Sequence, residues 1–214
     1  MATSILVADD HDLVRMGIVR MLSDIKGFDV IAEAKSGEDA VKLARKHKPN
    51  VVLMDVKMPG IGGLEATKKI LAVEPATKII AVSGVSDDMY ADRLMKAGAV
   101  GYVSKEAGFD EIINSIKKVV AGGRYMSAEV AQQLALKSFN PDADRSPFDE
   151  LSERELQTAL MISSGLKVSD IAESFCISPK TVNSYRYRIF EKLEINSDVE
   201  LALLAVKHNL LEMG

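Results

Sequence analysis

Five short apolar runs, separated by segments of helical periodicity, constrain the fold of the first half of the chain. The runs are Ser4–Ala8, Asp29–Ala34, Val51–Asp55, Lys78–Gly84 and Ala99–Lys105. They are continuously apolar rather than alternating, which indicates strands that are covered on both faces of a sheet. Strands that alternate with helices favour parallel pairing with right-handed crossovers. The pattern therefore predicts an α/β fold with a doubly wound, five-stranded parallel sheet.

Three of these predicted strands end in charged residues. The charged residues are Asp9 and Asp10 directly after the first strand, Asp55 at the end of the third strand and Lys105 at the end of the fifth. Ligands of open parallel sheets bind outside the carboxyl ends of the strands, so we expect these side chains to converge. Carboxylates this close repel by about 4 kcal/mol per pair at an effective dielectric of 20, and Mg²⁺ is a cation suited to oxygen ligands. The arrangement indicates aspartyl phosphate chemistry, with Asp55 as the nucleophile and Lys105 facing a phosphoryl oxygen.

The length of 214 residues favours two domains. A run of turn-forming residues at 138–147 indicates a linker. We therefore expect a first domain at residues 1–122, a linker with a short helix at residues 123–148, and a second domain at residues 149–214.

The lengths of the apolar runs and the number of cysteines indicate the cellular environment of the chain. No apolar stretch approaches the roughly eighteen residues of a membrane span, so we expect no membrane association. The single cysteine, Cys176, cannot pair within the chain, which suits the cytoplasm, and we expect it to be a small packed residue rather than a redox sensor. The net charge of −4 argues by itself against nucleic acid.

The second domain is predicted to be helical. Ser152 and Glu155 form a capping-box pattern that opens its first helix. Two further helices, Val168–Ser174 and Pro179–Lys192, have the spacing of small and apolar residues that a helix-turn-helix needs. A fourth helix, Asp198–Leu211, carries an apolar stripe that either joins the core or pairs two chains.

The segment Ser178–Leu193 is basic although the chain is acidic overall. If its apolar residues face inward, the side chains that face outward near the amino-terminal half are Lys180, Asn183, Ser184 and Tyr187. Side chains of this kind can contact base edges in a major groove. Those placed for phosphates are Arg186, Arg188 and Lys192. A solvated helix face is the alternative, and the shared orientation favours DNA.

Together these motifs resemble the receiver domain of bacterial two-component response regulators, joined to the helix-turn-helix of the NarL/FixJ (LuxR-type) class. The resemblance covers nearly the whole chain. It rests on the acid pair, VLMDVKMPG around Asp55, Ser83 with Gly84, Tyr102, Lys105, LSERE, SPKTV and EKL. The segment Thr181–Leu193 looks closest to the GacA/UvrY/VarA branch. The resemblance implies a flavodoxin-like receiver with a second, all-α domain.

The resemblance also implies roles for individual residues. Asp55 would accept phosphate from a sensor histidine kinase or phosphotransfer domain. Mg²⁺ would be held by Asp10, Asp55 and the main-chain carbonyl of Lys57, with Asp9 acting through water. Lys105 would contact the phosphoryl group, Ser83 would rotate toward it and Tyr102 would follow inward. The implied DNA-binding residues are Lys180, Thr181, Asn183, Ser184, Arg186, Tyr187, Arg188 and Lys192. A homodimer on double-stranded promoter DNA is expected after phosphorylation.

Two other functions are compatible with parts of the pattern. An aspartyl-phosphate phosphatase of the haloacid dehalogenase type needs a second aspartate two residues after the nucleophile, and Lys57 stands there. A receiver that signals only through protein contacts would not need the basic segment. We therefore expect a DNA-binding transcription regulator that is not a turnover enzyme.

The chain departs from the family pattern at three positions. Glu106 follows the lysine where many receivers have proline, so a cis peptide is not expected there. Cys176 and Tyr185 occupy positions that often hold glycine and histidine. The sequence leaves open whether Tyr185 contacts DNA or the core. His11 is expected to be a partly exposed loop residue rather than a metal ligand.

Overall fold

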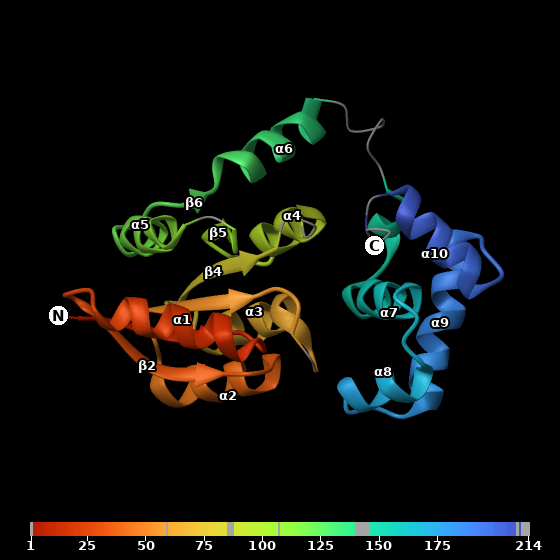
Figure 1. The fold of residues 1–214 in the computed structure, drawn as a ribbon, viewed down its shortest axis with the longest axis horizontal. Helices are drawn as coiled ribbons and strands as arrows, with labels where there is room; N and C mark the ends of the chain where they lie inside the picture. The colour runs from red at the N-terminus through yellow and green to blue at the C-terminus, as the bar shows by residue number, and fades with distance from the viewer. Residues whose placement is uncertain are drawn as a thin grey trace. The chain divides into compact units, whose positions relative to one another are not determined.

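The computed structural model describes residues 2–58, 60–84, 88–106, 108–139, 146–208 and residue 210. The chain divides into two compact units, Met1–Leu136 and Lys137–Gly214 (Figure 1). The strands of the first unit are β1 (Thr3–Ala8), β2 (Phe28–Ala34), β3 (Val51–Asp55), β4 (Lys78–Ser83), β5 (Gly101–Ser104) and β6 (Tyr125–Met126). Its helices are α1 (Asp12–Ser23), α2 (Gly37–His47), α3 (Gly62–Val73), α4 (Asp88–Lys96), α5 (Phe109–Val120) and α6 (Ala128–Phe139).

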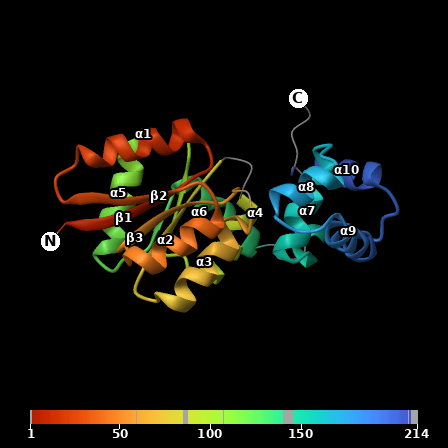
Figure 2. The ribbon, with the colours of Figure 1, turned by 90° about the horizontal axis from the view of Figure 1, so that it is seen from below.

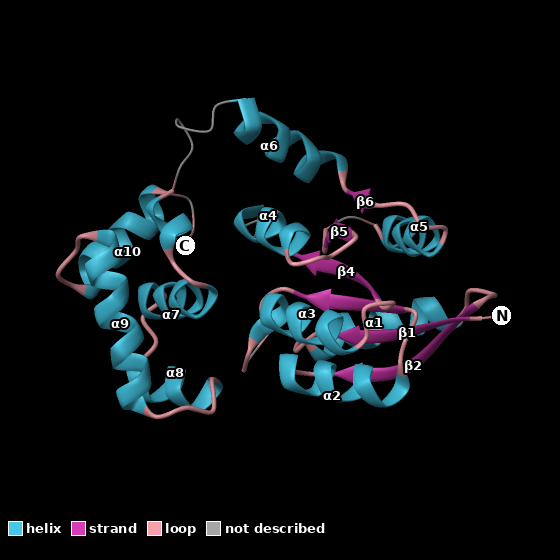
Figure 3. Cartoon of the chain, turned by 180° about the vertical axis from the view of Figure 1, so that it is seen from behind, coloured by secondary structure: helices cyan, strands magenta, loops and turns pink. Residues whose placement is uncertain are grey.

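All six strands form one parallel sheet with the order β2-β1-β3-β4-β5-β6 (Figure 3). Helices α1 and α5 lie on one side of the sheet, and α2 and α3 lie on the other (Figure 2). This confirms the predicted doubly wound α/β fold. The sequence analysis missed β6, because a strand of two residues is too short to show a pattern of its own.

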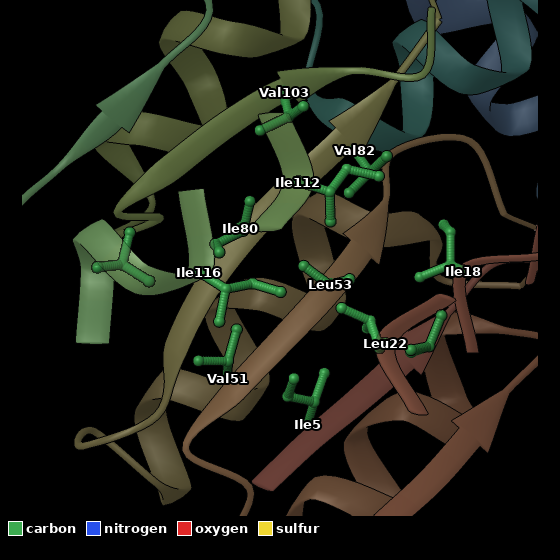
Figure 4. Close-up of a cluster of buried hydrophobic side chains, with 12 residues drawn as sticks. Ile5, Ile18, Leu22, Val51, Leu53, Ile80, Val82, Val103, Ile112 and Ile116 are labelled. Carbon is green, nitrogen blue, oxygen red and sulfur yellow. The ribbon is translucent and has the colours of Figure 1, made fainter. Parts of the chain in front are cut away.

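One face of the sheet packs against α1 and α5 through branched aliphatic side chains (Figure 4). The strands contribute Ile5, Val51, Leu53, Ile80 and Val103, and the helices contribute Ile18, Leu22, Ile112 and Ile116. All are at most 3% exposed. Full burial of such a side chain contributes about 1.5–3 kcal/mol, so this layer holds the strand ends in register.

In the described part of the second unit, a 3₁₀ helix, η2 (Pro147–Glu150), and four α-helices follow the end of α6. These are α7 (Glu153–Ser163), α8 (Val168–Ser174), α9 (Pro179–Leu193) and α10 (Asp198–Lys207). Helix α7 packs against α9 and α10, and α8 packs against α9. The capping box at Ser152 and Glu155 is confirmed, because Ser152 Oγ accepts from Glu155 N while Glu155 Oε2 accepts from Ser152 N.

Two residues that precede the expected start of the second domain at 149 are ordered against its helices. Phe148 is fully buried, and its ring meets the ring of His208 edge-on at a centroid distance of 6.2 Å. Ser146 caps η2 in a capping box with Asp149. Ser86 precedes two acidic residues, Asp87 and Asp88, and this pattern predicts a helix start. Ser86 and Asp87 lie outside the described residues, as do residues 140–145 of the expected linker.

The apolar stripe expected on the last helix, Val199, Leu203, Val206 and Leu210, is divided: Val206 and Leu210 are half-buried, and the first two residues are exposed. Val199 is 69% exposed and Leu203 is 66% exposed, whereas Leu201 and Ala205 are buried on the opposite face of α10. The core alternative is therefore wrong for Val199 and Leu203, and pairing of two chains remains the prediction.

Candidate functional sites

The acidic corner of the first unit is produced by strand register. Ala8 of β1 pairs with Met54 of β3, so the next residues, Asp9 and Asp55, leave the sheet side by side. One ligand atom from each of Asp9, Asp10, His11 and Asp55 lies within 4.8 Å of the others. The side chains of Asp9 and Asp55 are each only 2% exposed, and that of Asp10 is 32% exposed. The convergence predicted from the strand ends is therefore present.

Lys105 completes the corner from β5. Its Nζ atom lies 2.9 Å from Asp9 Oδ2 and 2.9 Å from Asp55 Oδ2. Its main-chain N–H donates to the carbonyl of Ser83 at 2.6 Å, which continues the β4–β5 pairing beyond the strand. The peptide bond to Glu106 is trans, as is every other in the described residues. The ammonium group thus stands between the two buried carboxylates.

Burial dominates the electrostatics of Asp55. The pKa of Asp55 is raised to about 7, chiefly by burial, while Lys105 opposes the rise and the carboxylates of Asp9 and Asp10 add to it. Burial alone lowers the pKa of Lys105, but Asp55 and Asp9 outweigh it and the net shift is upward. A lysine with a raised pKa stays charged at neutral pH. One ammonium group therefore faces three acids and does not fully neutralise them.

The acids fit a hard divalent cation. One side-chain oxygen each of Asp9, Asp10 and Asp55 is buried from solvent, and the Nδ1 atom of His11 lies 3.0 Å from that of Asp10. Two of these oxygens have the ammonium group of Lys105 at ion-pairing distance. Carboxylate oxygens are ligands that Mg²⁺ prefers. The corner can therefore hold a metal ion through oxygen atoms alone.

His11 lies at the rim of this corner. It is the N-cap residue of α1, its side chain is 64% exposed, and its Nδ1 atom lies 3.0 Å from Asp10 Oδ1. The partly exposed loop position expected from the sequence is confirmed.

The loop after β3 turns back over Asp55. The N–H of Lys57 donates to Asp55 Oδ1 at 3.3 Å, so the carboxylate is oriented by its own chain. A Cβ added to Gly63 would lie 2.1 Å from the carbonyl oxygen of Asp55, so only glycine allows α3 to begin this close to the strand.

Ser83 and Tyr102 are both buried beside the corner. Ser83 pairs with Ser104 in the β4–β5 register and is fully buried, and Tyr102 is 1% exposed. The sequence analysis expected the Tyr102 ring to move inward on phosphorylation. In this structure the ring is already inside.

The second unit contains the helix-turn-helix expected from the sequence. Ser178 Oγ accepts from the N–H of Thr181 at 3.1 Å and Pro179 occupies the first turn, so the start of α9 is as predicted. Cys176 in the preceding turn has a φ of +53° and is exposed. The left-handed backbone explains why glycine is common there. The expectation that Cys176 is packed was wrong, because the turn directs its side chain to solvent.

Helix α9 has one buried face and one exposed face. Val182, Ile189 and Leu193 are buried. The exposed residues among those predicted to bind DNA are Lys180, Ser184, Tyr187, Arg188 and Lys192, and those half-buried are Thr181, Asn183 and Arg186. Tyr187 is 73% exposed, whereas Tyr185 is half-buried. An exposed cationic and polar face therefore extends along α9, as the sequence predicts.

Two cations of α9 already have partners within their unit. Arg186 forms a two-pronged ion pair with Asp198, at 2.7 Å and 2.8 Å. Lys192 Nζ lies 2.6 Å from Glu155 Oε2 and donates to the carbonyl of Glu150 at 3.2 Å. From the sequence, both cations are predicted to contact DNA phosphates. In the structure each also pairs with a carboxylate, because α7 and the start of α10 lie beside α9.

Sequence reasoning missed one residue of the acidic corner, Arg15. Its guanidinium is buried and donates to the carbonyl of Asp9 at 2.8 Å. A signal was present, because Arg15 shares the i, i+3, i+7 stripe of α1 with Ile18 and Leu22, which are buried. A charge on a buried helix face indicates a specific partner.

A parallel α/β unit with a strand-end acid cluster and an opposing lysine, followed by a helix-turn-helix unit, defines a two-domain regulator with a receiver. Residues 5–117 match the response regulator receiver domain, and residues 149–205 match the luxR family of bacterial regulatory proteins. The chain belongs to the response regulator family, with a LuxR-type C-terminal domain.

Two curated relatives show where in this family the chain lies. It is 60% identical over 208 residues to the response regulator GacA of Pseudomonas aeruginosa, covering 97% of both chains. It is 52% identical over 207 residues to the response regulator UvrY of Escherichia coli K12, covering 97% of this chain and 95% of UvrY. The branch suggested by the Thr181–Leu193 segment is therefore confirmed.

A solved structure shares the fold across both units. RcsB of Salmonella enterica serovar Typhimurium, bound to promoter rprA in the presence of phosphomimetic BeF₃⁻, is 22% identical with a TM-score of 0.67. The match covers 95% of this chain and 98% of that one. Among the described residues, no helix combines the length and apolarity needed to cross a membrane.

Proposed function

We propose that this response regulator accepts a phosphoryl group at Asp55 and thereby controls promoter DNA binding by its helix-turn-helix. The observation that carries the proposal is the convergence of Asp9, Asp10 and Asp55 with Lys105 at the carboxyl edge of the sheet. The donor is a sensor histidine kinase or a phosphotransfer domain. Attack by the carboxylate of Asp55 on the phosphoryl group of the donor's phosphohistidine forms an O–P bond, breaks the N–P bond and releases the histidine imidazole, leaving an aspartyl phosphate.

In this proposal Mg²⁺ is held by Asp10, Asp55 and the carbonyl of Lys57, with Asp9 acting through water. When bound, the ion neutralises the acids and the phosphoryl oxygens. Lys105 is placed to pair with a phosphoryl oxygen, since its ammonium group already stands 2.9 Å from Asp55. In the proposal, Ser83 is the hydroxyl that rotates toward the phosphoryl group, and the buried ring of Tyr102 responds to that rotation.

Exposed apolar side chains beside the corner support a docking face for the phosphoryl donor. On α1, Leu13 is 87% exposed and Met16 is 61% exposed, and on α5, Phe109 is 55% exposed. A Cβ added to Gly17 would lie 4.0 Å from the Phe109 ring, so the two helices present one continuous surface. Both helices begin close to the acids and Lys105, where a donor histidine must arrive.

For DNA, the exposed face of α9 would enter the major groove. Its candidate contacts are Lys180, Thr181, Asn183, Ser184, Tyr187 and Arg188. We assign Arg186 and Lys192 to positioning α9, since both are ion-paired within the unit. Phosphate contacts supply sequence-independent affinity, and contacts to base edges supply specificity.

A homodimer would bind paired half-sites about 10 base pairs apart. The exposed pair Val199 and Leu203, four residues apart on α10, supports an apolar seam between two copies of the second domain. We place the receiver domain at residues 1–122, the linker and its short helix at 123–148, and the DNA-binding domain from 149. Phe148 and Ser146, at the end of the linker, pack with the DNA-binding domain.

The test compares the full chain with its Asp55→Asn variant in selecting genomic DNA fragments, with and without acetyl phosphate and Mg²⁺. If the proposal is correct, acetyl phosphate tightens the binding of the unsubstituted chain to the selected DNA fragments and leaves the binding of Asp55→Asn unchanged. DNA binding that is absent under all conditions, or that is independent of salt, would favour signalling through protein contacts instead.

A further inference from the structure

Arg15 is a buried cation that the proposed phosphoryl chemistry does not use. Its side chain is 5% exposed, although it lies in the first turn and a half of α1, directly behind the acid pair. Arginine is almost never buried without partners, because removing a charge from water costs several kcal/mol. The partners of Arg15 therefore indicate why the charge is retained.

The guanidinium of Arg15 connects three parts of the receiver. Its Nη1 donates to the carbonyl of Asp9 at 2.8 Å, its Nε donates to Glu33 Oε2 of β2 at 3.2 Å, and its Nη2 pairs with Asp12. Lys35 Nζ lies 2.9 Å from the same Asp12 carboxylate. The network therefore holds α1, β2 and the β1–α1 corner together.

The bond to Asp9 distinguishes this network from a simple link between a helix and a strand. Glu33 and Asp12 would be enough to attach α1 to β2. The additional donor reaches the peptide group between the two acids, while the N–H of Asp9 donates to the carbonyl of Ala34 at 3.1 Å. The main chain of Asp9 is thus held on both sides, and this sets the direction in which Asp9 and Asp10 project.

We propose that Arg15 is a positioning residue for the metal site: it holds the Asp9 peptide so that the carboxylates of Asp9 and Asp10 face a common cation with Asp55. The proposal rests on the proposed function, because it requires a divalent cation at this corner. Groups that orient metal ligands from behind typically change metal affinity by roughly 10–100-fold when removed.

The test measures Mg²⁺ affinity of the folded full chain by titrating MgCl₂ and following amide chemical shifts. Arg15→Met keeps the length of the side chain and removes its charge and donors. Arg15→Lys restores the charge and one donor. The matched control is Arg20→Met, because Arg20 lies on the same helix and its side chain is 83% exposed.

Arg15→Met is expected to weaken Mg²⁺ binding by roughly tenfold, Arg15→Lys by less, and Arg20→Met not at all. The concentration of Mg²⁺ that half-saturates labelling by acetyl phosphate should rise in the same order. If Arg15 only stabilised the fold, Arg15→Met would melt at a lower temperature but bind Mg²⁺ normally while folded. That result would overturn the proposal.

A second variant, Glu33→Gln, tests the proposal if Arg15→Met does not fold. Glu33→Gln removes one charged partner of Arg15, and the Glu33 side chain is 46% exposed, so the fold should tolerate it. A measurable loss of Mg²⁺ affinity supports the proposal, and an unchanged affinity in both Glu33→Gln and Arg15→Lys contradicts it. If the unsubstituted chain itself binds no Mg²⁺ and takes no label, the proposed function fails instead.

Discussion

The ammonium group of Lys192 lies 2.6 Å from the Oε2 atom of Glu155 and ties the carboxyl end of α9 to the start of α7. Glu155 is 4% exposed, and the same Oε2 atom caps α7 by accepting from Ser152 N. Nearer the amino end of α9, Arg186 forms an ion pair with Asp198 at the start of α10. The proposed recognition helix is thus joined by two ion pairs to the other helices of its unit.

Lys192→Met should destabilise the second domain by about 1–3 kcal/mol, because it leaves the buried carboxylate of Glu155 without its charged donor. Urea unfolding of the isolated domain measures this loss, and Lys180→Met on the exposed face is the matched control. In a double-mutant cycle, Glu155→Gln with Lys192→Met should be less destabilising than the sum of the single changes. Strict additivity would show that the pair does not couple the helices.

Substitutions on the exposed face of α9 should separate affinity from specificity. Arg188→Ala is expected to weaken all DNA alike and to reduce the salt slope by about one. Asn183→Ala or Tyr187→Ala should each reduce the preference for the selected site by about 1–3 kcal/mol, the typical worth of a good interaction with a base edge. Titrations on matched and scrambled DNA at several salt concentrations distinguish these outcomes. A uniform loss for all three variants would contradict the groove orientation.

The pKa of Asp55 predicts a pH-dependent stability. This pKa is raised from 3.8 to about 7 in the folded chain, chiefly by burial. Because Asp55 binds its proton more tightly in the folded chain, its contribution to the free energy of unfolding is greatest below its unfolded pKa of 3.8. This contribution is lost as the pH rises toward 7. Without Mg²⁺, Asp55→Asn should therefore exceed the unsubstituted chain in stability at pH 8, by on the order of 1–4 kcal/mol.

The stability difference between the two chains should shrink as pH falls from about 7 to 4. Adding Mg²⁺ at pH 8 should stabilise the unsubstituted chain more than the variant. Thermal unfolding at fixed pH values checks both. A difference that does not change with pH would rule out the ionisation of Asp55 as its origin.

The buried ring of Phe148 predicts the minimum length of an independent DNA-binding fragment. A fragment from Ser146 retains this ring and the η2 capping box, whereas a fragment from Asp149 lacks both. Loss of a buried phenylalanine side chain typically costs about 3–5 kcal/mol. The fragment from Asp149 should therefore unfold at a clearly lower temperature by circular dichroism. Equal melting temperatures would show that Phe148 does not belong to the folding unit.

Local sequence patterns predicted the first five strands and several helix starts, and each of these patterns has a physical cause. Continuous apolar runs located the first five strands, and their charged ends located the acidic corner, because parallel strands end at one edge. The capping-box pattern located the start of α7 at Ser152. Ser36, with Asp39 three residues on, and Ser178, before Pro179, have similar cap patterns in the sequence, and each accepts a main-chain N–H at the start of its helix. These signals act within a few residues and are visible in a single sequence.

The features that the sequence did not predict depend on tertiary neighbours. Arg186 and Lys192 look free along α9, and only the packing of α7 and α10 supplies their acids. Arg15 acquires its role from β2 and from the corner that it supports. Val199 and Leu203 follow a helical period, but the face of α10 that packs inward is the one with Leu201 and Ala205.

The central claim is that Asp55 is the phosphoryl acceptor, and intact-mass measurement after incubation with acetyl phosphate and Mg²⁺ tests it most directly. The unsubstituted chain should gain the mass of one phosphoryl group and lose it on removal from the donor, because an acyl phosphate hydrolyses. Asp55→Asn should gain none, while Lys105→Met should still be labelled, since Lys105 is placed to pair with a phosphoryl group rather than to carry it. Stoichiometric labelling of Asp55→Asn would contradict the account.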